Sequence, residues 1–178
     1  MNKQIAVIGL GRLGTSLAII LHDAGYEVLG IDKSIDLVEG ITPNITHAVV
    51  ADATRKEALQ KLGISSFDMA VVTIGASIEN SVMITILLKK LGVRYIVARA
   101  DNELHGEILE NIGADLAKGE SIDLKAISRR AAQVAEKRVI ERVLQQTRWN
   151  RKEAAERLQI SYKALLYKMK ENGLSEGR

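Results

Sequence analysis

The chain contains no cysteine, a single proline and few aromatic residues. The absence of cysteine excludes disulfides, thiolate metal sites and cysteine nucleophiles, and it is typical of a reducing cytoplasm. Aromatic residues make up only 3% of the 178 residues, whereas hydrophobic residues make up 47%. Ile, Leu, Val and Ala must therefore build the core, which is typical of parallel sheets covered by helices.

The sequence also lacks a targeting segment and long apolar runs. Its first four residues lead directly into a short strand-like run without a signal-peptide pattern. Apolar runs end well before the about 18 residues that suggest a membrane-spanning helix. We therefore expect a soluble, cytoplasmic protein with no direct insertion into a membrane.

The charge is divided unevenly along the chain. Residues 1–118 carry 11 Lys and Arg against 14 Asp and Glu, a net charge of −3. Residues 119–178 carry 14 against 8, a net charge of +6, which together give the +3 of the whole chain. This pattern predicts two domains, 1–118 and 119–178, of which only the second approaches phosphate. A solvated basic tail would explain the charge alone equally well.

Short apolar runs alternate with helical patterns in the first domain. The predicted strands are 4–8, 27–32, 47–51, 69–73, 95–99 and 115–117, and the predicted helices are 11–24, 35–40, 55–62, 78–91 and 103–112. Strands that alternate with helices through short loops form βαβ units. The pattern therefore predicts an α/β fold with a Rossmann-like, doubly wound parallel sheet.

A G-x-G-x-x-G motif, GLGRLG at residues 9–14, lies between the first predicted strand and helix. Gly9 permits a tight turn, Gly11 lets the backbone approach a pyrophosphate, and Gly14 allows close helix–strand packing. The phosphates would lie at the helix N-terminus, where free N–H groups and the helix dipole favour anions. Glycines that serve only as turns are the alternative.

Three charged residues near this motif are candidate ligand contacts. Asp32 ends the second predicted strand, where a carboxylate accepts hydrogen bonds from ribose hydroxyls and favours NAD or an adenosine nucleotide over NADP. Arg12 either reaches a terminal phosphate or is an exposed helix residue. Asp52 ends the third strand and either contacts the base or caps the next helix at Arg55.

No catalytic motif accompanies the predicted nucleotide site. The sequence has no Gly-x-Ser-x-Gly, Walker A loop, His-Glu-x-x-His or Tyr-x-x-x-Lys, and its three histidines show no metal-ligand spacing. The sheet also uses nearly all of residues 1–118, which leaves no second domain to bring a substrate to a nicotinamide ring. We therefore interpret the chain as a sensor of a nucleotide and not as an enzyme.

Residues 149–173 contain two short helical patterns joined by a turn. Asn150 is predicted to cap the first helix, with Glu153 completing a capping box, and Ser161 to cap the second, which ends at Asn172 and Gly173. The predicted inner residues are Ala154, Ala155, Leu158, Leu165, Leu166 and Met169; Tyr162, Lys163, Tyr167, Lys168 and Lys170 remain outside. The pattern predicts a small all-α helix-turn-helix domain that reads the DNA major groove.

A longer helix, about 124–145, precedes these two. Its apolar residues lie roughly along one stripe: Leu124, Ile127, Ala131, Val134, Ala135, Val139, Val143 and Leu144. Such a stripe indicates packing, and we expect it to form the interface of a homodimer.

Five blocks of the first domain resemble, in order, the N-terminal domain of the RCK family, the regulators of potassium conductance. They are IAVIGLGRLGTSLA, VLGIDKS, THAVVADAT, FDMAVVTIGASIENSVMITILLKKLGV and ARADNELHGEILENIGAD. The resemblance implies bound NAD(H), ATP or ADP, assembly as dimers or larger rings, and control of a membrane potassium transporter. The ligand positions it implies are Gly9, Gly11, Arg12, Leu13, Gly14, Asp32, Asp52, Ile74, Gly75 and Arg99. The second subdomain common in that family is missing.

Residues 140–174, IERVLQQTRWNRKEAAERLQISYKALLYKMKENGL, resemble the Fis-type C-terminal domain of bacterial enhancer-binding activators. The resemblance implies that the leading helix dimerises and that the last helix enters the major groove of double-stranded DNA. It implies DNA contacts at Asn150, Tyr162, Lys163, Tyr167 and Lys168. The ATPase module of those activators is absent.

Three functions follow from these observations. The preferred hypothesis is a homodimeric, ligand-responsive transcriptional regulator linked to potassium homeostasis. The second is a regulatory subunit of a potassium uptake transporter whose helical tail serves assembly. The third is a small NAD-dependent oxidoreductase.

Overall fold

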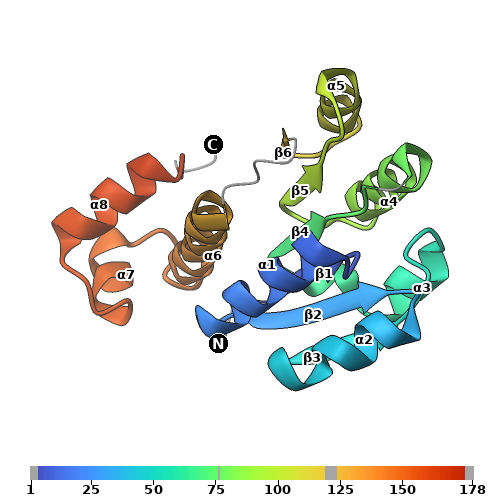
Figure 1. Cartoon of the computed structure of the whole chain (residues 1–178). Helices are drawn as coiled ribbons and strands as arrows, with labels where there is room; N and C mark the ends of the chain where they lie inside the picture. Colours follow the sequence, from blue (N-terminus) through green and yellow to red (C-terminus); the bar gives the residue numbers. More distant parts are fainter. Residues whose placement is uncertain (1–3, 76, 119–123, 175–178) are drawn as a thin grey trace. The chain divides into compact units, whose positions relative to one another are not determined.

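The computed structural model of the chain describes residues 4–75, 77–118 and 124–174 (Figure 1). Contacts between residues divide the chain into two compact units, Met1–Ser128 and Arg129–Arg178. The domain boundary expected at residues 118 and 119 adjoins a segment outside the described ranges, and it stays a prediction. Within these ranges, no helix is both long and apolar enough to cross a membrane.

Six parallel strands form the sheet of the first unit. They are β1 (Gln4–Ile8), β2 (Glu27–Asp32), β3 (His47–Val50), β4 (Met69–Val72), β5 (Ile96–Arg99) and β6 (Leu116–Lys118). Their order is β3-β2-β1-β4-β5-β6, which confirms the predicted doubly wound Rossmann-like sheet. The order reverses between β1 and β4, and ligands of such folds bind in the crevice at the carboxyl ends of these two strands.

The helices of this unit agree with the sequence pattern to within one residue at each end. They are α1 (Arg12–Asp23), α2 (Ile35–Ile41), α3 (Lys56–Lys61), α4 (Ile78–Lys90) and α5 (Glu103–Asn111). Two short 3₁₀ helices, η1 (Thr42–Asn44) and η2 (Ile64–Ser66), were not predicted. Each is a single turn, too short to produce a periodic apolar pattern.

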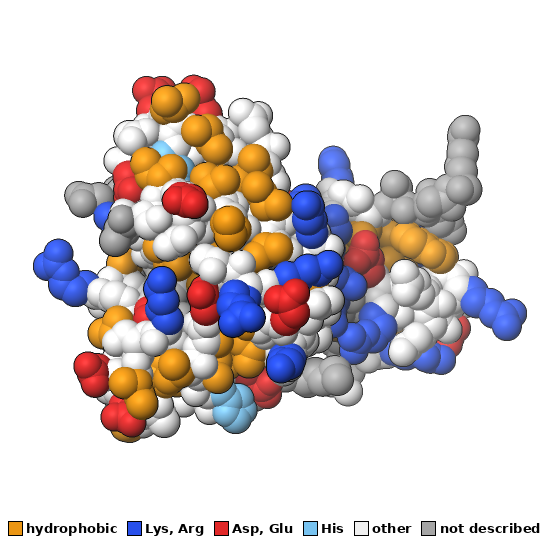
Figure 2. Space-filling view, turned by 90° about the vertical axis from the view of Figure 1, so that its right-hand side faces the viewer, with side chains coloured by type: hydrophobic (Ala, Val, Ile, Leu, Met, Phe, Trp, Pro, Cys, Tyr) orange, Lys and Arg blue, Asp and Glu red, His pale blue; other side chains and the backbone are white. Residues whose placement is uncertain are grey.

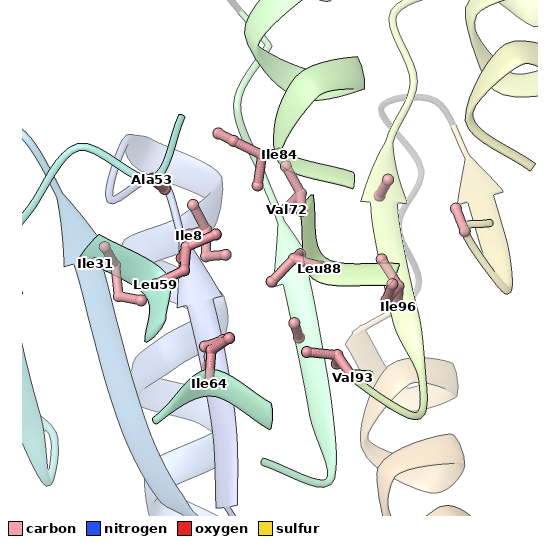
Figure 3. Packing of buried hydrophobic residues seen from close by; sticks show 14 of the residues in the cluster. Ile8, Ile31, Ala53, Leu59, Ile64, Val72, Ile84, Leu88, Val93 and Ile96 are labelled. Carbon is pink, nitrogen blue, oxygen red and sulfur yellow. The ribbon is translucent and has the colours of Figure 1, made fainter. Parts of the chain in front are cut away.

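The core lies on both faces of the sheet because successive strand residues point to opposite sides. On one face, Ile8 and Val72 pack against Leu59 of α3 and Leu88 of α4 (Figure 3). Helices α1 and α2 lie on the other face (Figure 1), where α1 contributes the buried Leu17. Burial of each such side chain contributes about 1.5–3 kcal/mol. The paired layers hold the strand ends, and therefore the crevice, in place.

Helices α4 and α5 also carry exposed apolar side chains. Figure 2 shows hydrophobic side chains gathered over these helices, in the upper half of the view. Leu104 is 67% exposed, Ile78 43% and Met83 42%. Larger apolar patches of this kind mark places where proteins associate.

The second unit is all-helical. Helix α6 (Leu124–Gln146) begins before the unit and continues into it, and α7 (Arg151–Arg157) and α8 (Tyr162–Glu171) follow. A small core unites the three helices: Ile140, Leu144, Ala154, Ala155, Leu165, Met169 and Leu174. The turn between α7 and α8 is tight, with Gln159 in the left-handed region at φ +54°. The predicted pair of short helices joined by a turn is thus present.

Candidate functional site

The glycine loop between β1 and α1 has the geometry that its three glycines predict. Gly9 adopts φ +98°, and a Cβ atom there would lie 2.9 Å from Ile74 Cγ1. A Cβ atom on Gly14 would lie 1.8 Å from the Gly9 carbonyl oxygen, so only glycine allows α1 to approach β1 this closely. A Cβ atom on Gly11 would meet nothing within 4 Å. Gly11 therefore leaves space open at the helix N-terminus, where a phosphate group fits.

A cleft of about 710 Å³ opens at this loop. Nine of the ten predicted ligand residues line it: Gly9, Gly11, Arg12, Leu13, Asp32, Asp52, Ile74, Gly75 and Arg99. Gly14 does not line the cleft, because it lies under the loop against Gly9. Residues far apart in the sequence thus meet at the carboxyl ends of β1, β2, β3, β4 and β5, as the topology requires.

Asp32 holds the glycine loop as well as lining the cleft. Its Oδ2 accepts a hydrogen bond from the Leu10 N–H at 2.6 Å, and its Oδ1 accepts one from the Ser34 N–H at 2.9 Å. Each carboxylate oxygen retains lone pairs for a further donor. A ribose placed here would meet a carboxylate that is already oriented by the backbone.

Asp52 makes a turn with Thr54 instead of capping α3. Its Oδ1 accepts hydrogen bonds from the Thr54 hydroxyl at 2.6 Å and the Thr54 N–H at 3.0 Å. The Thr54 hydroxyl is the main cause of a lowered pKa of the Asp52 carboxyl, followed by the Thr54 N–H; the charges of Lys33 and Arg55 add to the effect, while burial opposes it. Helix α3 has Arg55 at its N-cap without a side-chain hydrogen bond. Asp52 is therefore a fixed anion at the cleft.

Gly75 makes room for Arg99, a relationship that the sequence does not reveal. A Cβ atom on Gly75 would lie 2.5 Å from Arg99 Nη1. The guanidinium therefore lies directly over Gly75, where it lines the cleft, and its Nη2 is 3.8 Å from Asp101 Oδ1. This places a cation at the end of β5, across the crevice from the β2 end.

Several other cleft residues escaped the sequence analysis. Thr73 donates its hydroxyl to the Gly9 carbonyl at 2.6 Å and so joins the end of β4 to the glycine loop. Lys33, Thr54, Ser77 and Asn80 also line the cleft. Lys33 and Thr73 directly follow β2 and β4, and Ser77 and Asn80 lie at the N-cap and in the first turn of α4, and these positions were the available signal. Thr54 lies in the loop between β3 and α3. With Arg12 and Arg99 these residues give the cleft cations and hydrogen-bond donors for phosphate groups.

Metal ligands do not gather in this part of the chain. Among the residues that the structure describes, no group of three or more His, Cys, Asp or Glu side chains could hold a metal ion.

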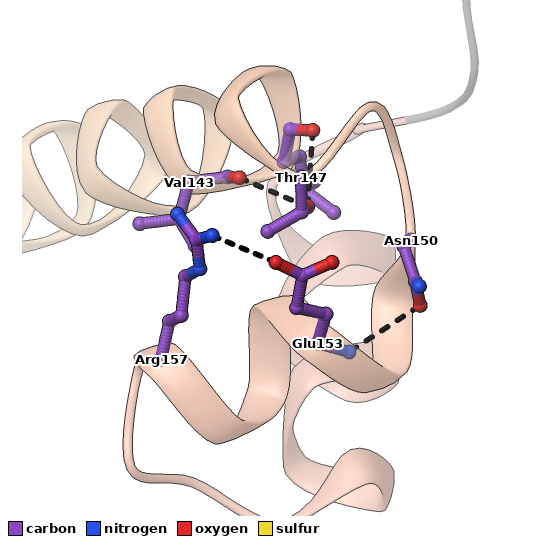
Figure 4. Close-up of polar contacts among 6 residues, drawn as sticks. Val143, Thr147, Asn150, Glu153 and Arg157 are labelled. Atoms are coloured by element: carbon purple, nitrogen blue, oxygen red, sulfur yellow. Dashed lines mark hydrogen bonds and ion pairs between the residues drawn. The ribbon is translucent and has the colours of Figure 1, made fainter.

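The start of α7 is capped as predicted, but without a complete capping box (Figure 4). The Glu153 N–H donates to Asn150 Oδ1 at 3.3 Å. The Glu153 carboxylate accepts from Arg157 at 2.7 Å instead of bonding back, and the Asn150 N–H donates to the Thr147 carbonyl. The reciprocal half of the box was therefore a wrong prediction, because Arg157 one turn later competes for the carboxylate.

Helix α8 begins and ends as predicted. Ser161 accepts from the Ala164 N–H at 3.1 Å. Asn172 is the C-cap, and Gly173 follows it with φ +62°. Leu165 and Met169 are buried, which leaves the opposite side of the helix in solvent.

Three of the proposed DNA-contact positions on α8 are exposed. Tyr162 is 44% and Tyr167 67% exposed, and Lys163 is also exposed. Leu166 was predicted to lie inside, but it is 37% exposed. Leu165 and Met169 are the residues of α8 that pack in the core of the unit.

Lys168 was also predicted to remain outside, but it lies against α6. Its Nζ forms an ion pair with the Glu136 carboxylate, and both side chains are about one third exposed. Spacing along α8 alone gives no sign of a carboxylate on another helix, 32 residues away in the sequence.

The predicted stripe on α6 divides between two environments. Leu144 is fully buried in the core of the second unit, and Val143 packs against it. Val139 is 48% exposed and so remains accessible. The side chains of Leu124, Ile127, Ala131, Val134 and Ala135 lie outside the described residues. Thus Leu144 stabilises the unit itself, and among the described residues of the stripe Val139 is accessible for a dimer.

Comparison with known families divides the chain in the same way. Residues 5–118 match the TrkA-N domain family. Residues 132–171 match the bacterial regulatory protein, Fis family, domain. Both matches confirm the resemblances that the sequence motifs predicted.

Among curated relatives, the Ktr system potassium uptake protein A of Bacillus subtilis is 46% identical over 114 residues. The match covers 64% of this chain and 51% of that protein. The chain spans about half the length of the curated relatives that it matches.

Two solved structures share the fold. The NAD(P)-binding domain of an exopolyphosphatase-related protein from Archaeoglobus fulgidus has a TM-score of 0.59 and 25% identity, over 77% of this chain and 99% of that one. The GsuK channel bound to NAD also has a TM-score of 0.59, with 16% identity, over 66% of this chain and 21% of that one.

Proposed function

The chain belongs to the TrkA-N domain family, and on that premise we propose that it is a nucleotide-sensing regulator that binds DNA through its second unit. The observation that carries the proposal is that one chain contains both a nucleotide-sized cleft and a helix-turn-helix pair. A cleft with an open glycine loop accompanies a capped helix pair whose second helix exposes Tyr and Lys side chains.

The ligand of the cleft is proposed to be NAD(H), ATP or ADP. The Gly11 loop and the N-terminus of α1 would hold phosphates, together with Arg12 and Arg99. Asp32 would accept hydrogen bonds from ribose hydroxyls, and its charge would repel the 2′-phosphate of NADP. We propose that the nucleotide is bound and sensed without being converted.

Double-stranded DNA is the proposed partner of the second unit. The net charge of +6 on residues 119–178 favours phosphate. The proposed DNA contacts are Asn150, Tyr162, Lys163, Tyr167 and Lys168. In a homodimer, two copies of α8 would enter major grooves about 34–36 Å apart, one helical turn of DNA.

The nucleotide would regulate DNA affinity through the dimer geometry. A ligand shifts an equilibrium only by binding one state more tightly than the other, and the coupling is reciprocal. The proposed coupling therefore requires DNA to change nucleotide affinity by the same factor.

A titration of duplexes selected from a random-sequence pool tests this proposal. DNA affinity is measured with no nucleotide and with NAD, NADH, ATP or ADP, using the whole chain. We expect at least one nucleotide to change DNA affinity about 5–150-fold, the usual range of allosteric coupling. The matched Gly11→Ala variant should bind DNA without responding to nucleotide. Failure to bind any duplex at low salt, with or without nucleotide, would contradict the proposal.

A second candidate function is a regulatory subunit of a potassium transporter. Two observations favour it. Several curated relatives are potassium uptake proteins, and α4 and α5 expose apolar surface. It predicts that the chain co-purifies with a membrane potassium transporter and leaves no footprint on DNA.

A further inference from the structure

Six exposed side chains of α8 form a continuous arc: Tyr162, Lys163, Leu166, Tyr167, Lys170 and Glu171. With 3.6 residues per turn, these positions span about 180° of the helix circumference, starting at Tyr162 beside the buried Met169. The arc is the part of α8 that a groove of DNA would contact first.

The chemistry of this arc differs from that of most base-reading helices. Between Tyr162 and Glu171 the sequence contains no Arg, Asn or Gln. Arginine and lysine recognise guanine, and asparagine and glutamine recognise adenine, through paired hydrogen bonds, so lysine alone of these four is present. Asn172, the next residue, is buried and donates to the Lys168 carbonyl at 2.9 Å, so its amide is engaged within the unit.

Leu166 and the two tyrosines supply the apolar surface of the arc. Leu166 lies one helical turn from both Tyr162 and Lys170, and Tyr167 lies about 100° further around the helix, beyond the two lysines. In the major groove, the feature that apolar side chains can recognise is the C5-methyl group of thymine. Lys163 and Lys170 lie about 10 Å apart along the helix axis, and their positive charge complements the phosphates beside the groove.

We propose that α8 recognises thymine through its methyl group, with Leu166 and Tyr167 as the main contacts and Tyr162 beside them. This inference rests on the proposed DNA-binding function and gives it a specificity: sites rich in A·T pairs. Lys163 and Lys170 bind phosphate and add affinity that does not depend on sequence.

Uracil substitution isolates the methyl group. Short duplexes of alternating dA and dT are compared with duplexes of alternating dA and dU, which keep every phosphate and every base hydrogen-bonding group. Fluorescence anisotropy measures their affinities for the whole chain. We expect the dT duplex to bind more tightly, by about fourfold for each methyl group that becomes buried.

Matched variants assign the preference to residues. Leu166→Ala and Tyr167→Ala should each lower the dT-to-dU affinity ratio, and the double variant should bring it close to one. Both side chains are exposed, so thermal unfolding should stay near that of the wild type. Lys163→Gln should weaken both duplexes equally and keep the ratio.

Each outcome separates this inference from the proposed function. Equal affinity for both duplexes, or tighter binding of dU, overturns methyl recognition and leaves DNA binding intact. A preference for dT that survives in the double variant assigns recognition to other residues and also overturns it. No binding to either duplex also overturns the inference, and it refutes the proposed function only if the duplexes selected from the random-sequence pool are not bound either.

Discussion

The Leu10 N–H donates a 2.6 Å hydrogen bond to Oδ2 of Asp32. This bond joins the glycine loop to the end of β2, so the carboxylate proposed to bind ribose also fixes the loop proposed to bind phosphate. A charge-assisted hydrogen bond of this kind contributes about 1.5–3 kcal/mol. Binding and loop structure therefore depend on one side chain.

Replacing Asp32 should affect both properties, and two variants separate them. Asp32→Ala should lower the free energy of unfolding by about 1–3 kcal/mol, because the Leu10 N–H loses its acceptor. Asp32→Asn keeps an acceptor, so it should lose less stability and yet weaken NAD binding. Calorimetry and denaturant unfolding measure the two effects. Equal NAD affinity in Asp32→Asn and the wild type would show that the charge does not bind ribose.

Gly11 and Gly14 should respond in opposite ways to the same substitution. Gly14→Ala places a methyl group against the Gly9 carbonyl and should cost about 1–3 kcal/mol of stability or more. Gly11→Ala meets open space, so the free energy of unfolding should change by less than about 1 kcal/mol. Its added methyl group should nevertheless weaken nucleotide binding about tenfold or more, since it occupies the place of the phosphate. A Gly11→Ala variant with normal nucleotide affinity would contradict this placement.

Thr54→Val should change the dependence of stability on pH. The lowered pKa of Asp52 stabilises the fold above the ordinary value of 3.8, and this stabilisation disappears as pH falls through the lowered pKa. Removing the Thr54 hydroxyl removes the largest cause, so the variant should be less stable than the wild type at neutral pH. The difference should shrink as pH falls below 3.8.

NMR titration of the Asp52 carboxyl measures this effect directly, and its pKa should rise in Thr54→Val. In an Asp52→Asn background, the loss of stability caused by Thr54→Val should not depend on pH. An unchanged titration of Asp52 would show that the hydroxyl is not its main partner.

Asn150 combines a helix cap with a proposed DNA contact. Asn150→Ala should lower the stability of the second unit by about 1 kcal/mol, because the Glu153 N–H loses its partner. Asn150→Asp should keep the cap but replace a donor amide with a negative charge, and so weaken DNA binding. Thermal unfolding and anisotropy separate these results. Full DNA affinity in Asn150→Asp would limit this residue to the cap.

Glu136 competes with phosphate for the Lys168 ammonium. An ion pair exposed to this degree contributes at most about 1 kcal/mol. Glu136→Gln should therefore strengthen DNA binding by up to about fivefold, the equivalent of that energy. Lys168→Gln should weaken binding and reduce the slope of log K against log salt by about one.

The double variant is the control for this pair. If Glu136 acts through Lys168, the double variant should bind DNA like Lys168→Gln alone. If Glu136→Gln strengthens binding equally in both backgrounds, Glu136 acts on DNA directly and Lys168 is only a structural partner.

The features that the sequence predicted correctly are those determined by residues close together in the sequence. Apolar runs and turn residues placed the predicted strand and helix ends of the first domain within one residue. The G-x-G-x-x-G spacing assigned different roles to Gly9, Gly11 and Gly14, and the space around each agrees with them. Ser161 and Asn150 cap helices because a cap involves residues only three positions apart.

Predictions that depend on contacts between distant residues were wrong or could not be made. Three such contacts join different elements: Arg99 lies over Gly75, Thr73 bonds to Gly9, and Lys168 pairs with Glu136. Leu166 lies at the border of the apolar side of α8, where periodicity cannot decide between core and solvent.

The order of the elements, the position of the glycine loop and the caps of the short helices follow from the sequence alone, because each depends on residues within a few positions of one another. The conformation of the loop also depends on the distant residues Asp32 and Thr73. Only the tertiary structure decided which side chains meet at the cleft and which face of α8 remains exposed. Those outcomes depend on how separate elements pack, because a side chain's partner is fixed only when both elements have their positions.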